Sequence, residues 1–269
     1  MNLSHELGCM SLHVDPYPYT GVDECGMPLL LIHGWGMHGG MWGGVTEKLA
    51  QHFQVYAVDL PGHGLSAAMA HFDLDSVVDN LSAQFPEPLS VCGWSMGGQV
   101  ALRWALRYPQ QVQRLILVAS TPSFVRRDDW NHAMSAELLQ EFTAALQQNY
   151  ALTLKRFLAL QLRGSEQERE ILAVLRQVLF NRGEPDLTAL QDGLAILLEC
   201  DLRSALSSIM QPALIIAGEL DALAPWQASQ YMAQQMPTTE LVKIKGAAHA
   251  PFLSHPEEFV GHVVKFLHG

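Results

Sequence analysis

The residue whose setting most clearly suggests chemistry is Ser95, in the pentapeptide Gly93-Trp94-Ser95-Met96-Gly97. It lies between an apolar run, LSVC, and a helical pattern, GQVALRWALRY. A serine between glycines at a sharp strand-to-helix turn is typical of an acyl-transfer nucleophile, because only residues without bulk fit so tight a turn. The N–H groups at the helix start would favour negative charge there. We therefore expect Ser95 to be a nucleophile.

A serine hydroxyl becomes reactive when a nearby base accepts its proton, and His249 fits that role best among 12 histidines. It lies in a loop of small residues, GAAHAP, between the last strand pattern and the last helical pattern. That position should bring it to the same sheet edge as Ser95. His255 precedes Pro256 at a helix start and is expected to position that end. His33, at the end of an early strand, is expected to pack and hydrogen-bond locally.

The histidine in turn needs a carboxylate that holds its tautomer and stabilises its charged form, and Asp221 is the candidate. Asp221 follows the strand pattern ALIIA within the segment GELD. Glu219 is a weaker alternative acid. Asp59, in VDLPGHG, is interpreted as a structural turn residue.

Acyl transfer also requires N–H donors for the oxyanion. The N–H of Met96 is expected to supply one donor. The second is assigned to Trp35, in the loop HGWG that follows the early strand. Trp35 and Trp94 would also wall the pocket, although buried aromatic residues are more often ordinary core.

Apolar runs alternating with helical patterns predict an α/β fold, with a mostly parallel central sheet flanked by helices. Strands are predicted at residues 28–33, 54–59, 89–92, 115–119, 213–217 and 240–244. Helices are predicted at residues 44–52, 73–84, 97–108, 225–235 and 256–267.

The strand signal disappears between residues 122 and 206, where four amphipathic helical patterns replace it, at 135–149, 152–162, 166–181 and 187–199. Ser165 followed by Glu168 predicts a capping box at the start of the third. A helical block inside an α/β alternation predicts a four-helix lid that excludes water from the site. The alternative is that these helices only thicken the core. The predicted division is core 1–122, lid 123–206 and core 207–269.

Composition narrows the possible partners of the chain. The formal net charge of −11 disfavours binding to nucleic acid or to an anionic membrane, both of which need a basic surface. Neither a metal-ligand spacing nor a phosphate-binding glycine loop is present, so no metal and no cofactor are expected. Four scattered cysteines, no signal sequence and no long apolar run indicate free thiols and a soluble cytoplasmic protein, expected to be a monomer. The cysteines are Cys9, Cys25, Cys92 and Cys200.

With these residues in place, the chain resembles the α/β-hydrolase superfamily over nearly its whole length, including the chain order Ser95, Asp221, His249. It more narrowly resembles the carboxylesterases of biotin synthesis that demethylate pimeloyl-[acyl-carrier protein] methyl ester. The motifs are LLLIHGWGMHGGMW, VDLPGHGLS, GWSMGG, RFLALQ and GAAHAPFLSHPEEF. The resemblance implies substrate contacts from Trp35, Ser95, Met96, Phe157, Leu158, Ala159, Leu160, Gln161 and His249.

The charge pattern is consistent with an acyl-carrier protein as partner. Residues 123–185 carry eight basic and eight acidic side chains, so the net charge of −11 resides elsewhere. An acidic carrier would be steered toward this segment, although solvated helix faces would show the same pattern. Leu152 and Ala173 stand where the family pattern suggests arginine, and the lead at residues 1–25 has no interpretation. The docking candidates are Arg156, Arg163, Arg169 and Arg176.

The sequence therefore predicts a serine carboxylesterase in which Ser95 attacks a methyl ester and His249 transfers the protons. One alternative keeps the triad but acts on another substrate, such as a short-chain ester, a lactone, a C–C bond or a perhydrolysis reaction. Haloalkane dehalogenation is disfavoured because that chemistry uses aspartate at the serine position. A second alternative is a receptor-like binding protein on the same scaffold.

Overall fold

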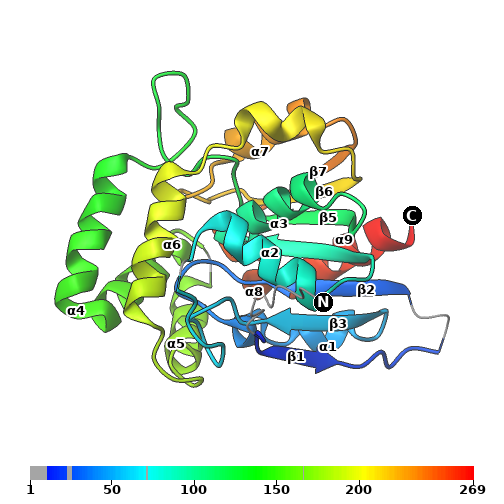
Figure 1. Ribbon diagram of the computed structural model, residues 1–269, viewed down its shortest axis with the longest axis horizontal. Coiled ribbons are helices and arrows are strands. Elements are labelled where there is room, and N and C mark those ends of the chain that lie inside the picture. The colour runs from blue at the N-terminus through cyan, green and yellow to red at the C-terminus, as the bar shows by residue number, and fades with distance from the viewer. Residues whose placement is uncertain (1–10, 23–25, 71, 166) are drawn as a thin grey trace, which may run out of the picture.

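The computed structural model describes residues 11–22, 26–70, 72–165 and 167–269. Within these residues the centre is a seven-stranded sheet with the order β1-β3-β2-β4-β5-β6-β7 (Figure 1). Neighbouring strands are parallel except β1 and β3, which are antiparallel. The strands are β1 (Val14–Tyr17), β2 (Gly26–Ile32), β3 (Phe53–Val58), β4 (Leu89–Trp94), β5 (Val112–Val118), β6 (Ala213–Gly218) and β7 (Thr239–Ile244).

The central strands are continuous apolar runs because both faces of the sheet are covered. Every residue of β4 and of β6 is buried, as expected for parallel strands between helical layers. Val91 pairs with Leu115, and Leu117 pairs with Ile215. Because β2, β4, β6 and β7 run in the same direction, their carboxyl ends meet at one edge of the sheet.

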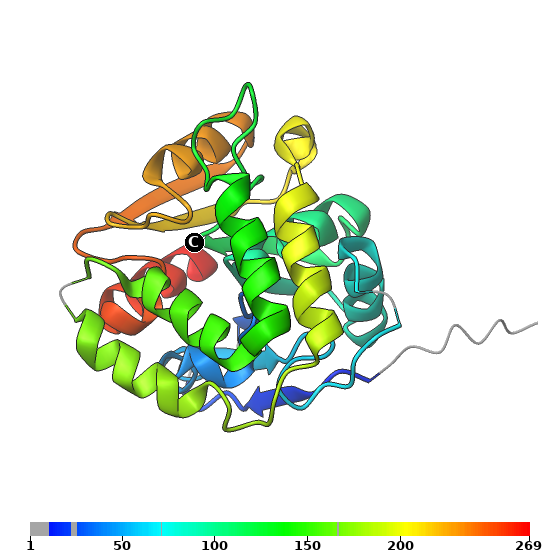
Figure 2. The same ribbon diagram turned by 90° about the vertical axis from the view of Figure 1, so that its left-hand side faces the viewer.

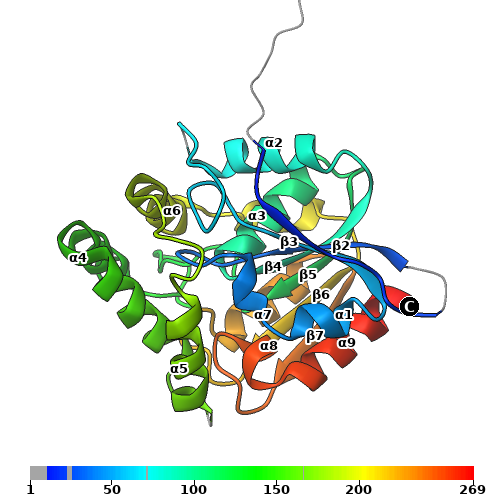
Figure 3. The same ribbon diagram turned by 90° about the horizontal axis from the view of Figure 1, so that it is seen from below.

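Helices lie on both faces of the sheet (Figure 3). α2 (Leu74–Gln84) packs with α3 (Met96–Arg107) on one face, and α1 (Val45–Leu49) packs with α9 (Pro256–His268) on the other. α2 begins after Asp73, whose carboxylate accepts the N–H of Ser76 at 2.9 Å. The remaining short elements are η1 (Gly39–Trp42), η2 (Arg203–Ser208), α7 (Trp226–Gln235) and α8 (Pro251–Ser254). The predicted α/β architecture is confirmed.

The segment between β5 and β6 carries α4 (Ala136–Leu162), α5 (Glu168–Val178) and α6 (Leu187–Glu199), called here the helical insertion. Figure 2 views these helices from their own side, in front of the sheet. α4 is 27 residues long and is kinked at Asn149, whose backbone is not helical. The Asn149 side chain accepts the N–H of Leu152 at 2.9 Å, so it caps the second half of the helix.

The two helices predicted at 135–149 and 152–162 correspond to the two halves of α4 on either side of the kink at Asn149. Other local predictions need correction. The capping box is wrong, since α5 begins at Glu168 and the Glu168 carboxylate accepts the N–H of Gly164 at 3.0 Å. The seven-residue spacing of Arg156 and Arg163 predicts a shared helix face, but Arg163 follows the end of α4, so the two do not share one. The sequence also missed β1.

Two cysteines lie in the described part of the chain, Cys92 and Cys200, and both are free thiols. Burial raises the pKa of the Cys92 thiol, and it raises that of Cys200 to about 12. Cys9 and Cys25 lie outside the described residues. Within the described ranges, no helix is long and apolar enough to cross a membrane.

Candidate active site

Ser95 occupies a strained turn between β4 and α3. Its backbone has φ 57° and ψ −120°, a conformation that residues with side chains rarely adopt. A Cβ at Gly93 would lie 2.2 Å from the Gly97 carbonyl oxygen, and one at Gly97 would lie 2.4 Å from that of Ile32. Both flanking positions therefore require glycine, and the turn presents Ser95 at the start of α3.

His249 links the Ser95 hydroxyl to a carboxylate. Its Nε2 lies 2.8 Å from Ser95 Oγ, and its Nδ1 lies 2.8 Å from Asp221 Oδ2. Because a carboxylate only accepts hydrogen bonds, Nδ1 carries the proton that it donates to Asp221. Nε2 is then free to accept the Ser95 proton. All three side chains are buried, so the chain of hydrogen bonds lies away from bulk water.

Loops at the ends of β6 and β7 bring Asp221 and His249 together. Leu220 N–H donates to the Ala247 carbonyl at 2.8 Å, which joins the two loops. Asp221 Oδ1 accepts the N–H groups of Leu223 and Ala224 at 2.8 and 3.0 Å, so the carboxylate is held from its other side. The carboxylate orientation is therefore fixed by its own loop.

The backbone of His249 is also held by distant residues. Its carbonyl accepts the indole N–H of Trp94 at 2.7 Å, and its N–H donates to the Gln161 carbonyl at 3.0 Å. The second contact links the last turn of α4 directly to the histidine loop. Neither contact is predictable from the sequence, because no local pattern reveals a partner 88 or more residues away.

The two residues expected to supply oxyanion donors lie beside Ser95. Met96 is the first residue of α3, where N–H groups lack partners within the helix. A Cβ at Gly34 would lie 3.1 Å from Ser95 Cβ, so the loop carrying Trp35 passes close to the serine. Trp35 and Met96 are both fully buried.

The expected substrate residues of α4 fall into two groups. The Phe157 ring packs edge-on against Trp35 with centroids 4.8 Å apart, and Gln161 contacts His249 through its carbonyl. The side-chain Oε1 of Gln161 is buried without a hydrogen-bond partner. Leu158 is buried in the core, whereas Ala159 and Leu160 are half-buried.

The residues weighed against His249 and Asp221 as base and acid hydrogen-bond to other groups. Glu219 is exposed and accepts the N–H of Gly246 at 3.0 Å. His255 Nδ1 lies 2.8 Å from Ser254 Oγ, at the start of α9.

His33 Nε2 accepts the N–H of Leu60 at 2.9 Å. Asp59 accepts the N–H groups of Gly39 and Leu65 at 2.6 and 2.9 Å, which is the contact pattern of a structural turn residue.

A buried polar cluster lies behind the loops that follow β2 and β3. Burial lowers the pKa of His33 to about 3 and that of His63 to about 4, so both are neutral near pH 7. Burial alone would raise the pKa of Asp59, but His33, two backbone N–H groups and Arg182 hold it below its usual value. Arg182 reaches Asp59 from the connection between α5 and α6, with Nη1 3.2 Å from both carboxylate oxygens. Arg182 thus links the helical insertion to the loop after β3 rather than standing as a solvated charge.

Two hollows lie at the insertion. One of about 180 Å³ sits between the two halves of α4, where Phe142 and Arg156 are among its lining residues. Phe142 packs edge-on against Phe157, with centroids 5.4 Å apart, and these packed rings separate the hollow from Trp35. The other, about 540 Å³, lies between α2, α3 and α6, and its lining includes none of Ser95, Asp221 and His249.

The alpha/beta hydrolase family matches residues 29–262. The chain belongs to this family. It is 47% identical to a pimeloyl-[acyl-carrier protein] methyl ester esterase of Nitrosomonas europaea over 87% of this chain and 93% of that protein. It is 43% identical to the protein of that name from Chromobacterium violaceum, over 87% and 92%. Both relatives are similar along nearly their full length.

Solved structures show the same fold. An esterase from Exiguobacterium antarcticum superposes with a TM-score of 0.86 at 22% identity, covering 97% of this chain and 96% of that one. An enol-lactonase from Burkholderia xenovorans gives 0.82 at 22% identity, with 96% of each chain covered. These likenesses bear on the fold alone.

The candidate docking arginines Arg156, Arg163, Arg169 and Arg176 are all exposed. Arg169 and Arg176 both lie on α5, seven residues apart. Within the described ranges, no group of three or more His, Cys, Asp or Glu side chains is arranged to hold a metal ion.

Proposed function

We propose that this protein is a serine carboxylesterase that hydrolyses the methyl ester of pimeloyl-[acyl-carrier protein] to the free acid and methanol, a reaction of biotin biosynthesis. The observation that carries the chemistry is the buried hydrogen-bond chain from Asp221 through His249 to Ser95, with 2.8 Å at each step. The substrate follows from relatives of that name that are similar to this chain over most of its length.

In the first half-reaction, Ser95 Oγ attacks the ester carbonyl carbon while His249 Nε2 accepts the hydroxyl proton. The N–H groups of Trp35 and Met96 stabilise the oxyanion. His249 then gives its proton to the methoxy oxygen, the C–O bond breaks and methanol leaves. The acyl group remains on Ser95.

In the second half-reaction, water replaces the alcohol. His249 takes a proton from the water, which attacks the acyl carbonyl, and the proton returns to Ser95 Oγ as the acyl bond breaks. Asp221 keeps the imidazole in the required tautomer during both halves. The chemistry needs neither a metal nor a cofactor.

The helical insertion is the proposed lid, within the boundaries 123–206, and the proposed docking surface for the carrier. Its exposed arginines lie on a neutral segment of an otherwise acidic chain, which would orient an acidic carrier toward α4 and α5. The hollow beside Arg156 is the proposed entrance for the acyl arm, which would displace the packed rings of Phe142 and Phe157 to reach Trp35. The enzyme would act as a cytoplasmic monomer.

The test is turnover of the carrier-bound methyl ester by the purified full chain. Methanol release and the change in carrier mass are measured for the wild type and for Ser95→Ala. We expect steady turnover by the wild type and none by the variant. In the part of the chain that the structure describes, no hydroxyl other than that of Ser95 is hydrogen-bonded to His249 Nε2.

The matched control is Ser207→Ala, an exposed serine in η2, which should keep wild-type turnover. Circular dichroism and denaturant unfolding check that Ser95→Ala remains folded. Retained activity in Ser95→Ala would overturn the assigned nucleophile. Hydrolysis of small esters without hydrolysis of the carrier ester would overturn the substrate but not the chemistry.

A further inference from the structure

The Trp35 ring is held by two helices of the insertion. Its indole N–H donates to the Leu190 carbonyl in α6 at 2.8 Å. Phe157 of α4 packs edge-on against the same ring. The backbone N–H of this residue is the proposed second oxyanion donor, so contacts with the ring bear on the position of a reacting group.

Gly193 is the residue that lets α6 approach Trp35 so closely. A Cβ at Gly193 would lie 2.6 Å from Trp35 Cδ1, 3.1 Å from its Nε1 and 3.5 Å from Met96 Sδ. The first distance is shorter than real Cβ contacts, so a side chain at this position would force the indole or the helix to move. Glycine inside a helix costs about 1 kcal/mol relative to alanine, which indicates a packing reason for its presence.

The N-terminal end of α6 is tied to the hydrolase core. Asp186 N–H donates to the Gly62 carbonyl at 2.8 Å, and the Asp186 carboxylate caps the helix by accepting the N–H of Ala189 at 2.9 Å. A Cβ at Gly62 would lie 2.3 Å from Ala189 Cβ, so the first turn of α6 rests directly on the loop after β3.

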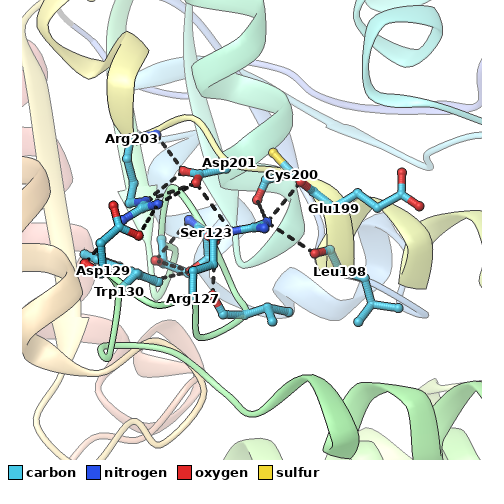
Figure 4. A network of polar contacts seen from close by, with 11 residues as sticks. Ser123, Arg127, Asp129, Trp130, Leu198, Glu199, Cys200, Asp201 and Arg203 are labelled. Carbon is cyan, nitrogen blue, oxygen red and sulfur yellow. Dashed lines mark hydrogen bonds and ion pairs between the residues drawn. The ribbon is translucent and has the colours of Figure 1, made fainter.

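The C-terminal end of α6 is held by a cluster of arginines and aspartates (Figure 4). Arg127 Nη2 donates to the carbonyls of Leu198, Glu199 and Cys200 at 3.3, 3.1 and 3.5 Å. A guanidinium at this end also matches the helix dipole. Arg127 forms an ion pair with Asp201 at 3.3 Å.

The same cluster joins the two ends of the insertion to each other. Arg203 Nη2 binds Asp201 at 2.7 Å and Asp129 at 3.0 Å (Figure 4). Leu202 N–H donates to the Pro122 carbonyl at 2.9 Å. Both ends of α6 are therefore anchored, and a clash in its middle cannot be relieved by a simple shift of the helix.

We propose that α6 is a fixed strut that sets the position of the Trp35 loop, and that Gly193 is a positioning residue for ester hydrolysis. This inference rests on the proposed function, in which the Trp35 N–H stabilises the oxyanion. A bulkier residue at 193 displaces the indole rather than the anchored helix. The loop backbone moves with the ring, and the donor then meets the oxyanion with poorer geometry.

The test is Gly193→Ala in the full chain, assayed with a short p-nitrophenyl ester that needs no carrier. Loss of one oxyanion donor costs about 10²- to 10³-fold in rate, so its displacement should lower kcat about 10-fold, with KM changed less than about 3-fold. The affinity for a trifluoromethyl ketone, whose serine adduct carries an oxyanion, should fall by the same factor as kcat/KM.

A double-mutant cycle separates positioning from general damage. Trp35→Phe keeps the backbone N–H but has a smaller ring and lacks the indole N–H. Trp35→Phe alone should lower kcat several-fold, because the hydrogen bond from the indole N–H to the Leu190 carbonyl is lost. In this background Gly193→Ala should cost less than about 2-fold, since the clash is relieved and the two changes are not additive. Asp192→Ala, a neighbour that lines the larger hollow, is the matched control and should keep wild-type kcat.

An unchanged kcat in Gly193→Ala, or an equal loss in both backgrounds, would overturn the proposal. If Gly193→Ala fails to fold, an unchanged kcat in Trp35→Phe would overturn it instead. A wild type that hydrolyses the small ester but not the carrier ester would reject the substrate and leave the role of Gly193 standing. A wild type that hydrolyses no ester would overturn both.

Discussion

At the scale of single residues, the site depends on strain and on contacts that reach all sides of each group. Ser95 can adopt its unusual backbone because Gly93 and Gly97 have no side chains to clash in the tight turn, and its N–H donates to the Val118 carbonyl at 2.9 Å. His249 is held through both ring nitrogens and both backbone groups. In the proposed reaction such groups would need little reorganisation, which lowers the barrier.

The Asp221→Asn variant tests the carboxylate. An amide N–H facing His249 would favour the tautomer that carries its proton on Nε2, which cannot accept the Ser95 proton. We expect kcat on a p-nitrophenyl ester to fall about 10³- to 10⁴-fold with little change in unfolding midpoint, in line with the effect known for serine proteases.

The matched control for that variant is Glu219→Gln, two residues away and exposed. Its kcat should remain within about 2-fold of wild type, because its carboxylate contacts Gly246 N–H rather than the histidine. The reverse pattern, with Glu219→Gln inactive and Asp221→Asn active, would transfer the acid role to Glu219.

At the scale of elements, the two sides of the insertion have different surroundings. α6 is anchored at both ends, whereas α4 is kinked at Asn149 and presents Arg156 to solvent beside a hollow. α5 adds Arg169 and Arg176 on an exposed face. A partner that docks on α4 and α5 would therefore leave the contact of α6 with Trp35 undisturbed.

The double charge reversal Arg156→Glu and Arg169→Glu tests the docking surface. We expect kcat/KM on the carrier-bound ester to fall about 10-fold or more at low salt, and by less at high salt because screening weakens the added repulsion. Turnover of a small ester should not change.

Lys265→Glu, which reverses an exposed charge on α9, is the matched control and should affect neither substrate by more than about 2-fold. Equal losses on both substrates in the double variant would point to damage of the site and reject docking on α4 and α5.

At the scale of the whole molecule, the buried histidines couple folding to pH. The pKa of His33 is lowered to about 3 and that of His63 to about 4 in the folded chain, against about 6.5 when unfolded. At pH values between the folded and unfolded pKa of each histidine, the unfolded chain binds more protons than the folded one. The free energy of unfolding therefore falls as the pH drops below about 6.5, and each histidine costs roughly 1–2 kcal/mol between pH 7 and pH 5.

Urea unfolding between pH 5 and pH 8 measures this dependence. His63→Gln removes one of the two groups, so its loss of stability from pH 7 to pH 5 should be smaller by roughly 1–2 kcal/mol. His132→Gln, at an exposed position, should retain the wild-type dependence. Identical pH dependence in wild type and His63→Gln would reject His63 as a contributor.

Most of the fold was predictable because its signals are local. Six of the described strands and the flanking helices were predicted within a few residues, since strand and helix periods are written in neighbouring residues. β1 was missed because VDPY has no apolar run and contains a proline, as suits an edge strand. The start of α5 was missed because helix ends depend on capping contacts, which side-chain types alone do not fix.

The sequence by itself determined which residues are able to do chemistry. It set Ser95 in a turn that only glycines permit, and it set Asp221 and His249 just beyond later strands, because parallel strands carry such loops to one edge. The tertiary structure decided which distant groups hold them: Gln161 and Trp94 on His249, Leu190 and Gly193 on Trp35, Arg182 on Asp59. Those partners are separated by 88 to 158 residues, and no local pattern determines contacts that form only when the whole chain packs.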